Sequence, residues 1–127
     1  MRQDSSERNE IAGSFPGRAP LLKIGDNLLC TSPDGNNLVL REMKEGWKEI
    51  ATLEGHEMTI YSTTMMGDKL VSGGWDNYVK VWDLSTKTCL VTLDIGIYVN
   101  SLCVDPATDT IWAGGYCGFT QKLQFSQ

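Results

Sequence analysis

The stretch from Leu70 to Asp83, LVSGGWDNYVKVWD, decides the fold of this 127-residue chain. Its second half, Tyr78–Trp82, alternates valines with larger side chains, which places successive side chains on opposite faces of a β-strand. The dipeptide Asp76–Asn77 just before it is a turn signal, and a further alternating run, Lys69–Gly73, precedes that turn. The stretch therefore predicts two short strands joined by a tight turn.

The same period of two continues along the chain, and no window shows a sustained helical period. Turn signals rich in Gly, Asp, Asn and Pro separate the runs. We therefore predict an all-β fold. The predicted strands are Leu21–Ile24, Asn27–Thr31, Asn37–Glu42, Ile60–Met65, Lys69–Gly73, Tyr78–Asp83, Val99–Val104, Thr110–Gly114 and Thr120–Phe125.

A repeat organises these strands. The segment Glu49–Gly55 recurs as Leu90–Gly96 and, more faintly, upstream as Glu10–Gly17. Three predicted strands follow each copy, so a unit of roughly 40 residues holds four strands, which is the make-up of a β-propeller blade. We predict a polar, disordered tail over residues 1–9 and about three four-stranded antiparallel blades over residues 10–127. In this scheme Glu10–Phe15 is a displaced outer strand.

The middle unit resembles a WD40 repeat. It has the Gly-His mark at Gly55–His56, the Trp-Asp mark at Trp82–Asp83 and Ser72 followed four residues later by Asp76. The flanking units depart from that pattern. Arg41–Glu42 and Gln124–Phe125 stand at or near the Trp-Asp position, Gly17–Arg18 stands at the Gly-His position, and Cys117 lies near the Asp position. The resemblance therefore implies an incomplete or partial WD40-type propeller, with the family's polar network in the middle blade only.

That network comprises His56, Ser72, Asp76 and Trp82, and the resemblance implies that it is structural. Asp76 accepts from one imidazole nitrogen, the other nitrogen meets the Ser72 hydroxyl, and the Trp82 indole donates to Ser72. The same residue types also make up a hydrolase triad, which is an alternative reading. A nucleophilic serine needs an exposed position and oxyanion donors, whereas Ser72 lies inside an alternating strand. We therefore predict a non-catalytic protein without a catalytic residue.

The resemblance also implies where partners bind. In WD40 proteins the usual binding positions lie at the start of each inner strand and just before the turn Asp. Four of the six corresponding residues are aromatic, and aromatic side chains dominate interface hot spots. The alternative, that Tyr61 and Tyr98 pack between blades, stays open. The predicted protein-binding residues are Thr59, Tyr61 and Trp75 in the middle unit and Tyr98, Asn100 and Tyr116 in the third.

Composition excludes several other classes of function. The chain has a net charge of −5 and scattered basic residues, which disfavours a nucleic-acid partner. No apolar run approaches the roughly 20 residues that span a bilayer, so we expect no membrane partner. The first ten residues lack the apolar stretch of a signal peptide, so we expect a cytoplasmic or nuclear location. Four cysteines without a CxxC pair and a single histidine predict no metal site, and we expect no cofactor.

Two function classes remain. The first is a protein-interaction module or scaffold that binds other proteins or peptides. The second is a truncated propeller fragment without independent function. Because three blades cannot close a ring, whereas two copies supply six, we also expect self-association that completes a propeller.

Overall fold

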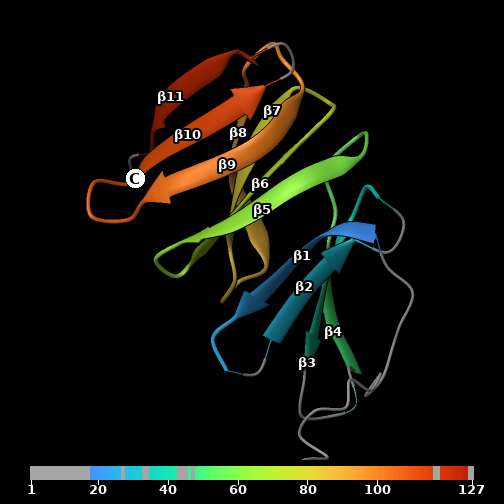
Figure 1. The fold of residues 1–127 in the computed structure, drawn as a ribbon. Coiled ribbons are helices and arrows are strands. Elements are labelled where there is room, and N and C mark those ends of the chain that lie inside the picture. Colours follow the sequence, from blue (N-terminus) through green and yellow to red (C-terminus); the bar gives the residue numbers. More distant parts are fainter. Residues whose placement is uncertain are drawn as a thin grey trace, which may run out of the picture.

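The described part of the chain forms β-strands joined by short turns and loops (Figure 1). The computed structural model describes residues 18–26, 28–32, 35–42, 46, 48–115 and 118–125. The predicted tail over residues 1–9 and the predicted outer strand Glu10–Phe15 lie outside these ranges. No helix long and apolar enough to cross a membrane occurs among the described residues.

The strands make three antiparallel sheets in chain order, and each strand pairs with the one before it in its sheet. The first sheet holds β1 (Arg18–Ile24), β2 (Leu28–Ser32), β3 (Leu38–Glu42) and β4 (Lys48–Leu53). The second sheet holds β5 (Ile60–Met66), β6 (Lys69–Gly74), β7 (Tyr78–Asp83) and β8 (Thr88–Asp94). The third sheet holds β9 (Val99–Asp105), β10 (Thr110–Gly115) and β11 (Thr120–Gln124).

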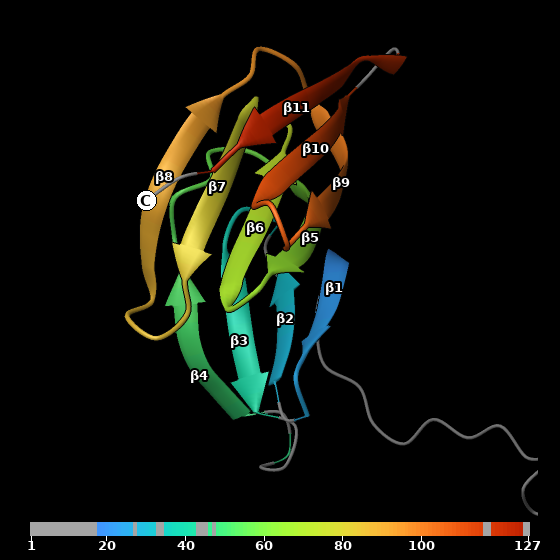
Figure 2. The same cartoon turned by 90° about the vertical axis from the view of Figure 1, so that its left-hand side faces the viewer.

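The predicted fold class is confirmed. Each of the nine predicted strands is present with bounds shifted by three residues or fewer, and the repeated segments Glu49–Gly55 and Leu90–Gly96 contain most of the outer strands β4 and β8. Three strands of the third sheet are described, and its predicted fourth strand, Glu10–Phe15, lies outside the described residues. The three sheets do not close into a ring (Figure 2).

The sheets stack face to face, with the inner strands β1, β5 and β9 next to one another (Figures 1 and 2). Between the first two sheets lies a core that includes Leu38, Leu53 and Trp82. Between the second and third sheets lies another core, which includes Val79 and Ile111. The second sheet is therefore covered on both of its faces.

Gly73 lets the third sheet approach the second. A Cβ atom at this position would lie 2.5 Å from Cγ1 of Val99, the first residue of β9, which is far closer than two carbon atoms can pack. Glycine at this point of β6 thus permits close contact between β6 and the inner strand β9 of the next sheet.

The second and third sheets share one register, including a bulge at the same place. In β5 the extra residue of the bulge lies between Ile60 and Ser62, opposite β6. In β9 it lies between Val99 and Ser101, which pair with Gly115 and Gly114 of β10. Matching the sheets on this bulge puts Leu123 where Trp82 stands, since these residues pair with Ile111 and Leu70. Leu123–Gln124 therefore stand at the Trp-Asp position, one residue before the pair Gln124–Phe125 that the sequence predicts near it.

The outward face of the third sheet differs from the equivalent face of the second. In the second sheet Val71, Val79 and Val81 are fully buried against the third sheet. By the shared register Trp112, Thr120 and Lys122 occupy the equivalent positions of the third sheet, and all three are exposed. The Lys122 Nζ lies 5.3 Å from the centre of the Trp112 ring, so the ammonium group partly covers this tryptophan.

Candidate functional site

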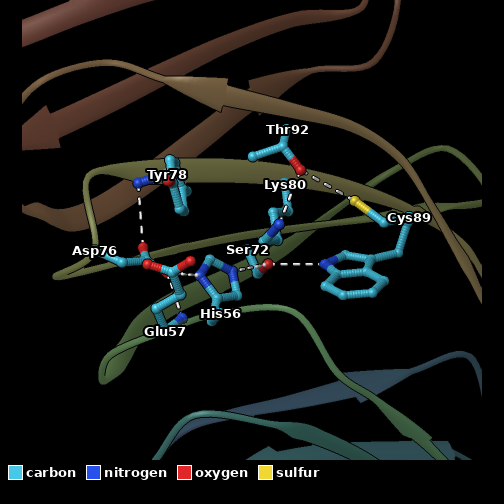
Figure 3. Close-up of polar contacts among 9 residues, drawn as sticks. His56, Glu57, Ser72, Asp76, Tyr78, Lys80, Cys89 and Thr92 are labelled. Atoms are coloured by element: carbon cyan, nitrogen blue, oxygen red, sulfur yellow. Dashed lines mark hydrogen bonds and ion pairs between the residues drawn. The ribbon is translucent and has the colours of Figure 1, made fainter.

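A chain of four polar side chains links the loop before β5 to strands β6 and β7 (Figure 3). The Nδ1 atom of His56 lies 2.8 Å from Oδ2 of Asp76, and its Nε2 lies 2.7 Å from Oγ of Ser72. The indole Nε1 of Trp82 donates to the same Ser72 oxygen over 2.8 Å. The structure thus brings together all four residues of the network predicted from the WD40 resemblance.

The donors and acceptors of this chain match completely. The Asp76 carboxylate only accepts and the Trp82 indole only donates, so Nδ1 of His56 carries its proton and the Ser72 hydroxyl donates to Nε2. Ser72 is fully buried, and two neighbours hold its oxygen. The Ser72 hydroxyl is therefore enclosed, whereas the hydrolase reading requires an exposed one.

The Asp76 carboxylate fixes the turn between β6 and β7 as well as the imidazole. Besides His56, it accepts from the backbone amides of Glu57 at 2.8 Å and Tyr78 at 3.1 Å. Burial alone would raise the pKa of Asp76, but the hydrogen bonds from His56, Glu57 and Tyr78 outweigh it and lower the pKa below its ordinary value. The side chain is 2% exposed, so Asp76 is held as a buried carboxylate.

Trp75 starts the turn that Asp76 fixes. Its backbone amide donates to the Thr59 carbonyl over 2.9 Å, which ties the turn to the start of β5. Asn77, two residues later, has a φ of 70°, a left-handed conformation that asparagine tolerates better than most residues. The Trp75 side chain is consequently displayed at the edge of the sheets where the inner strands begin.

An aromatic row runs along this edge. The Trp75 ring lies 4.8 Å from the Tyr61 ring and 5.8 Å from the Tyr98 ring, where the two planes are only 20° apart. The Trp75 indole nitrogen donates to Oδ1 of Asn100 over 3.3 Å. We call Tyr61, Trp75, Tyr98 and Asn100 the aromatic row; together with Thr59 it unites five of the six residues predicted to bind protein. The sixth, Tyr116, lies outside the described residues.

The row lies at the surface. Tyr61 and Tyr98 are each 44% exposed, so neither is buried between sheets, and Trp75 is half-buried. Two further apolar side chains, Met58 and Phe119, lie in loops on the same edge and are 48% and 64% exposed. The sequence interpretation missed both, although an apolar residue inside a polar loop is the signal that could have found them.

The three cysteines that the structure describes divide into two groups. Cys30 is buried in the core between the first two sheets, and burial raises the pKa of its thiol to about 12. Cys89 and Cys103 are exposed and unpaired. Within the described ranges no group of three or more His, Cys, Asp or Glu residues could hold a metal ion.

Comparison with known proteins agrees with this architecture. Residues 47–83 match the WD40 family model, described as "WD domain, G-beta repeat". The chain also superposes on the crystal structure of the WD40 β-propeller domain of Doa1 with a TM-score of 0.74 and 23% identity, over 85% of this chain and 36% of that one. Residues 47–83 are therefore similar to a WD40 repeat, and the three sheets have the fold of WD40 propeller blades. The resemblance drawn from the sequence is confirmed.

Similar proteins are much longer than this chain. Zinc finger CCCH domain-containing protein 17 of Oryza sativa subsp. japonica is 32% identical over 80 residues, 61% of this chain and 18% of that protein. WD repeat-containing protein pop1 of Schizosaccharomyces pombe is 34% identical over 68 residues, 54% of this chain and 9% of that protein. The chain thus spans less than a fifth of either relative.

Proposed function

We propose that this protein is a non-catalytic interaction module that binds a protein or peptide segment on the aromatic row. The observation that carries the proposal is the packing of Tyr61, Trp75 and Tyr98 into one partly exposed surface. Large, rigid aromatic side chains lose little entropy on binding and are enriched in interface hot spots. A WD40 propeller fold and a WD-repeat relative support the same role.

The polar chain supports a non-catalytic role. His56, Ser72 and Asp76 satisfy one another and two backbone amides, and their side chains are buried. A nucleophile must reach its substrate, whereas Ser72 is enclosed by the imidazole and the Trp82 indole. These residues hold the blade in shape so that the adjoining turn can present Trp75.

The outward face of the third sheet bears on self-association. Exposed Trp112 favours contact with a second copy. A second copy that covered this face in the way that the third sheet covers the second would bury Lys122, which stands where the second sheet has Val81. A buried ammonium without a matched partner is costly. In place of the self-association expected from the sequence, we therefore propose that this face does not pair with a second copy in that arrangement.

We also propose a reducing location, cytoplasmic or nuclear, because Cys89 and Cys103 are exposed as free thiols. Such thiols persist where glutathione and thioredoxin keep cysteines reduced. A cell-fractionation experiment with the tagged intact chain tests the location.

The experiment that tests the function compares half-buried Trp75 of the aromatic row with Trp112, which is exposed on a different face. Immobilised intact chain, Trp75→Ala and Trp112→Ala would capture proteins from a cell extract, and the bound proteins would then be titrated individually. Loss of a hot spot costs about 2 kcal/mol or more, so Trp75→Ala should weaken binding about 30-fold. Trp112→Ala should bind like the parent chain. If folded Trp75→Ala keeps the parent affinity for every captured protein, the binding surface lies elsewhere.

A further inference from the structure

We propose that the segment bound on the aromatic row is basic, with an arginine or lysine as its anchor. This inference rests on the proposed function and names the chemistry of the partner. It comes from the charges around the row, from the way this chain places its own lysines over aromatic rings, and from the hydrogen bond between Trp75 and Asn100.

The described loops that flank the row carry negative charge only. They comprise residues 54–59, 75–77, 94–98 and 118–119, and within these segments Glu54, Glu57 and Asp94 are exposed while no lysine or arginine occurs. Asp76 does not add to the exposed charge, because its carboxylate is buried and hydrogen-bonded. A cationic segment is thus attracted to this edge, and an acidic segment or a nucleic acid is repelled.

The opposite edge of the sheets, where the inner strands end, has mixed charge. Lys69 and Lys87 lie there together with Asp68, whose carboxylate is 3.2 Å from the Lys69 ammonium. Charges of both signs are the ordinary condition of a solvated surface. The exposed charges of the loops beside the aromatic row are therefore of one sign, although the ammonium of Lys80, in β7, lies close to Gly55 of one of these loops.

Among the residues that the structure describes, the rings of Tyr78 and Trp112 lie under lysines of the same chain. Lys80 Nζ is 5.4 Å from the centre of the Tyr78 ring, and Lys122 Nζ is 5.3 Å from that of Trp112. The rings of Tyr61 and Trp75 have no such lysine among the described residues. A cation is attracted to the face of an aromatic ring, so a basic side chain of a partner can make the contact that the chain makes elsewhere with its own lysines.

Asn100 supplies a contact for the backbone of the segment. Its Oδ1 accepts from the Trp75 indole, which orients the amide group and leaves the Nδ2 hydrogens as donors. Asn100 is exposed, so a peptide carbonyl can accept from it. One polar donor beside stacked rings holds the main chain while the basic side chain lies against the aromatic surface.

The test uses the intact chain and three synthetic peptides of one length. All have glycine and serine spacers, and their anchor positions carry arginine and lysine, glutamine, or glutamate. Binding of the labelled peptides is measured by fluorescence anisotropy at low and high salt. We expect the basic peptide to bind more weakly as salt rises, and the other two to bind at least tenfold more weakly than it at low salt.

Variants locate the site. Trp75→Ala should weaken the basic peptide about tenfold, and Glu57→Gln a few-fold. The matched controls Trp112→Ala and Asp68→Asn, which lie away from the row, should leave its affinity unchanged. Tyr61→Ala replaces Trp75→Ala if a thermal melt shows that the latter does not fold.

The inference is overturned if the glutamine or glutamate peptide binds as well as the basic one, or if the control variants lose as much affinity as Trp75→Ala. Its failure is separable from failure of the proposed function. If captured proteins need Trp75 for binding but the chain shows no preference for the basic peptide, this inference is refuted and the interaction role stands.

Discussion

Replacement of Asp76 by alanine should destabilise the fold far more than replacement of Asp83, although both carboxylates accept three hydrogen bonds. Asp76 accepts from His56 and from the amides of Glu57 and Tyr78. Asp83 accepts from the amide and hydroxyl of Ser85 and from the amide of Thr86. The two sites differ in burial, since all three bonds of Asp83 lie at the surface.

The size of the effect follows from what each substitution leaves without a partner. Asp76→Ala leaves the buried His56 imidazole and the part-buried Tyr78 amide unpaired, whereas water can reach the exposed Glu57 amide. A buried donor without an acceptor costs about 1–3 kcal/mol, so the two groups together cost about 2–6 kcal/mol. For a chain of this size that lowers Tm by on the order of 10 °C. In Asp83→Ala, water replaces the carboxylate and Tm should change little.

Thermal melts followed by circular dichroism measure both variants against the parent chain. Ser72→Ala provides a second reading, because it removes the hydroxyl that joins His56 to Trp82 and should also destabilise clearly. Equal Tm shifts for Asp76→Ala and Asp83→Ala, or an unchanged Tm for Asp76→Ala, would refute the argument that the buried polar chain supports the blade.

Three further outcomes are expected. The pKa of Asp76 is lower in the folded than in the unfolded protein, so the stability that its ionised carboxylate contributes is present above the unfolded pKa and is lost as pH falls through the folded pKa. Denaturant titrations below about pH 5 should therefore show a shallower loss of stability for Asp76→Asn than for the parent chain. A thiol reagent should label Cys89 and Cys103 in the folded protein but Cys30 only on unfolding, as peptide mass spectrometry would show; rapid labelling of Cys30 under native conditions contradicts its burial. Sedimentation should give a monomer for the parent chain. The double variant Thr120→Val with Lys122→Val should associate, because it gives the third sheet an apolar face like that of the second. A dimer of the parent chain that persists in Lys122→Glu would count against the proposal.

The sequence predicts the sheets well because local patterns specify them. Alternation fixes the strands, and turn residues such as Asp76–Asn77 fix their ends, so neither depends on distant parts of the chain. The polar network was predictable for a similar reason, since His56 and Trp82 lie in a repeat whose marks stand at fixed spacing.

Contacts between sheets were harder to predict. Sequence pointed to Trp75, Tyr98 and Asn100 singly, but their stacking and the indole hydrogen bond depend on how the third sheet packs beside the second. The Trp75 side chain is consequently more constrained than a free turn residue, and Trp75→Ala removes a hydrogen bond within the row. Exposure of Cys89 and Cys103 likewise depends on which sheet faces receive a neighbour, which a period-two pattern does not state.

The stacking of sheets in chain order also governs how the protein gains and loses structure. Each sheet is made from consecutive strands, so it forms by closing short loops, and its neighbours along the chain are its neighbours in space. The second sheet alone among the three has described sheets on both faces, whereas the others have one such neighbour. Amide hydrogens of β6 and β7 should therefore exchange last, and fraying should begin at the outer sheets and advance toward the centre.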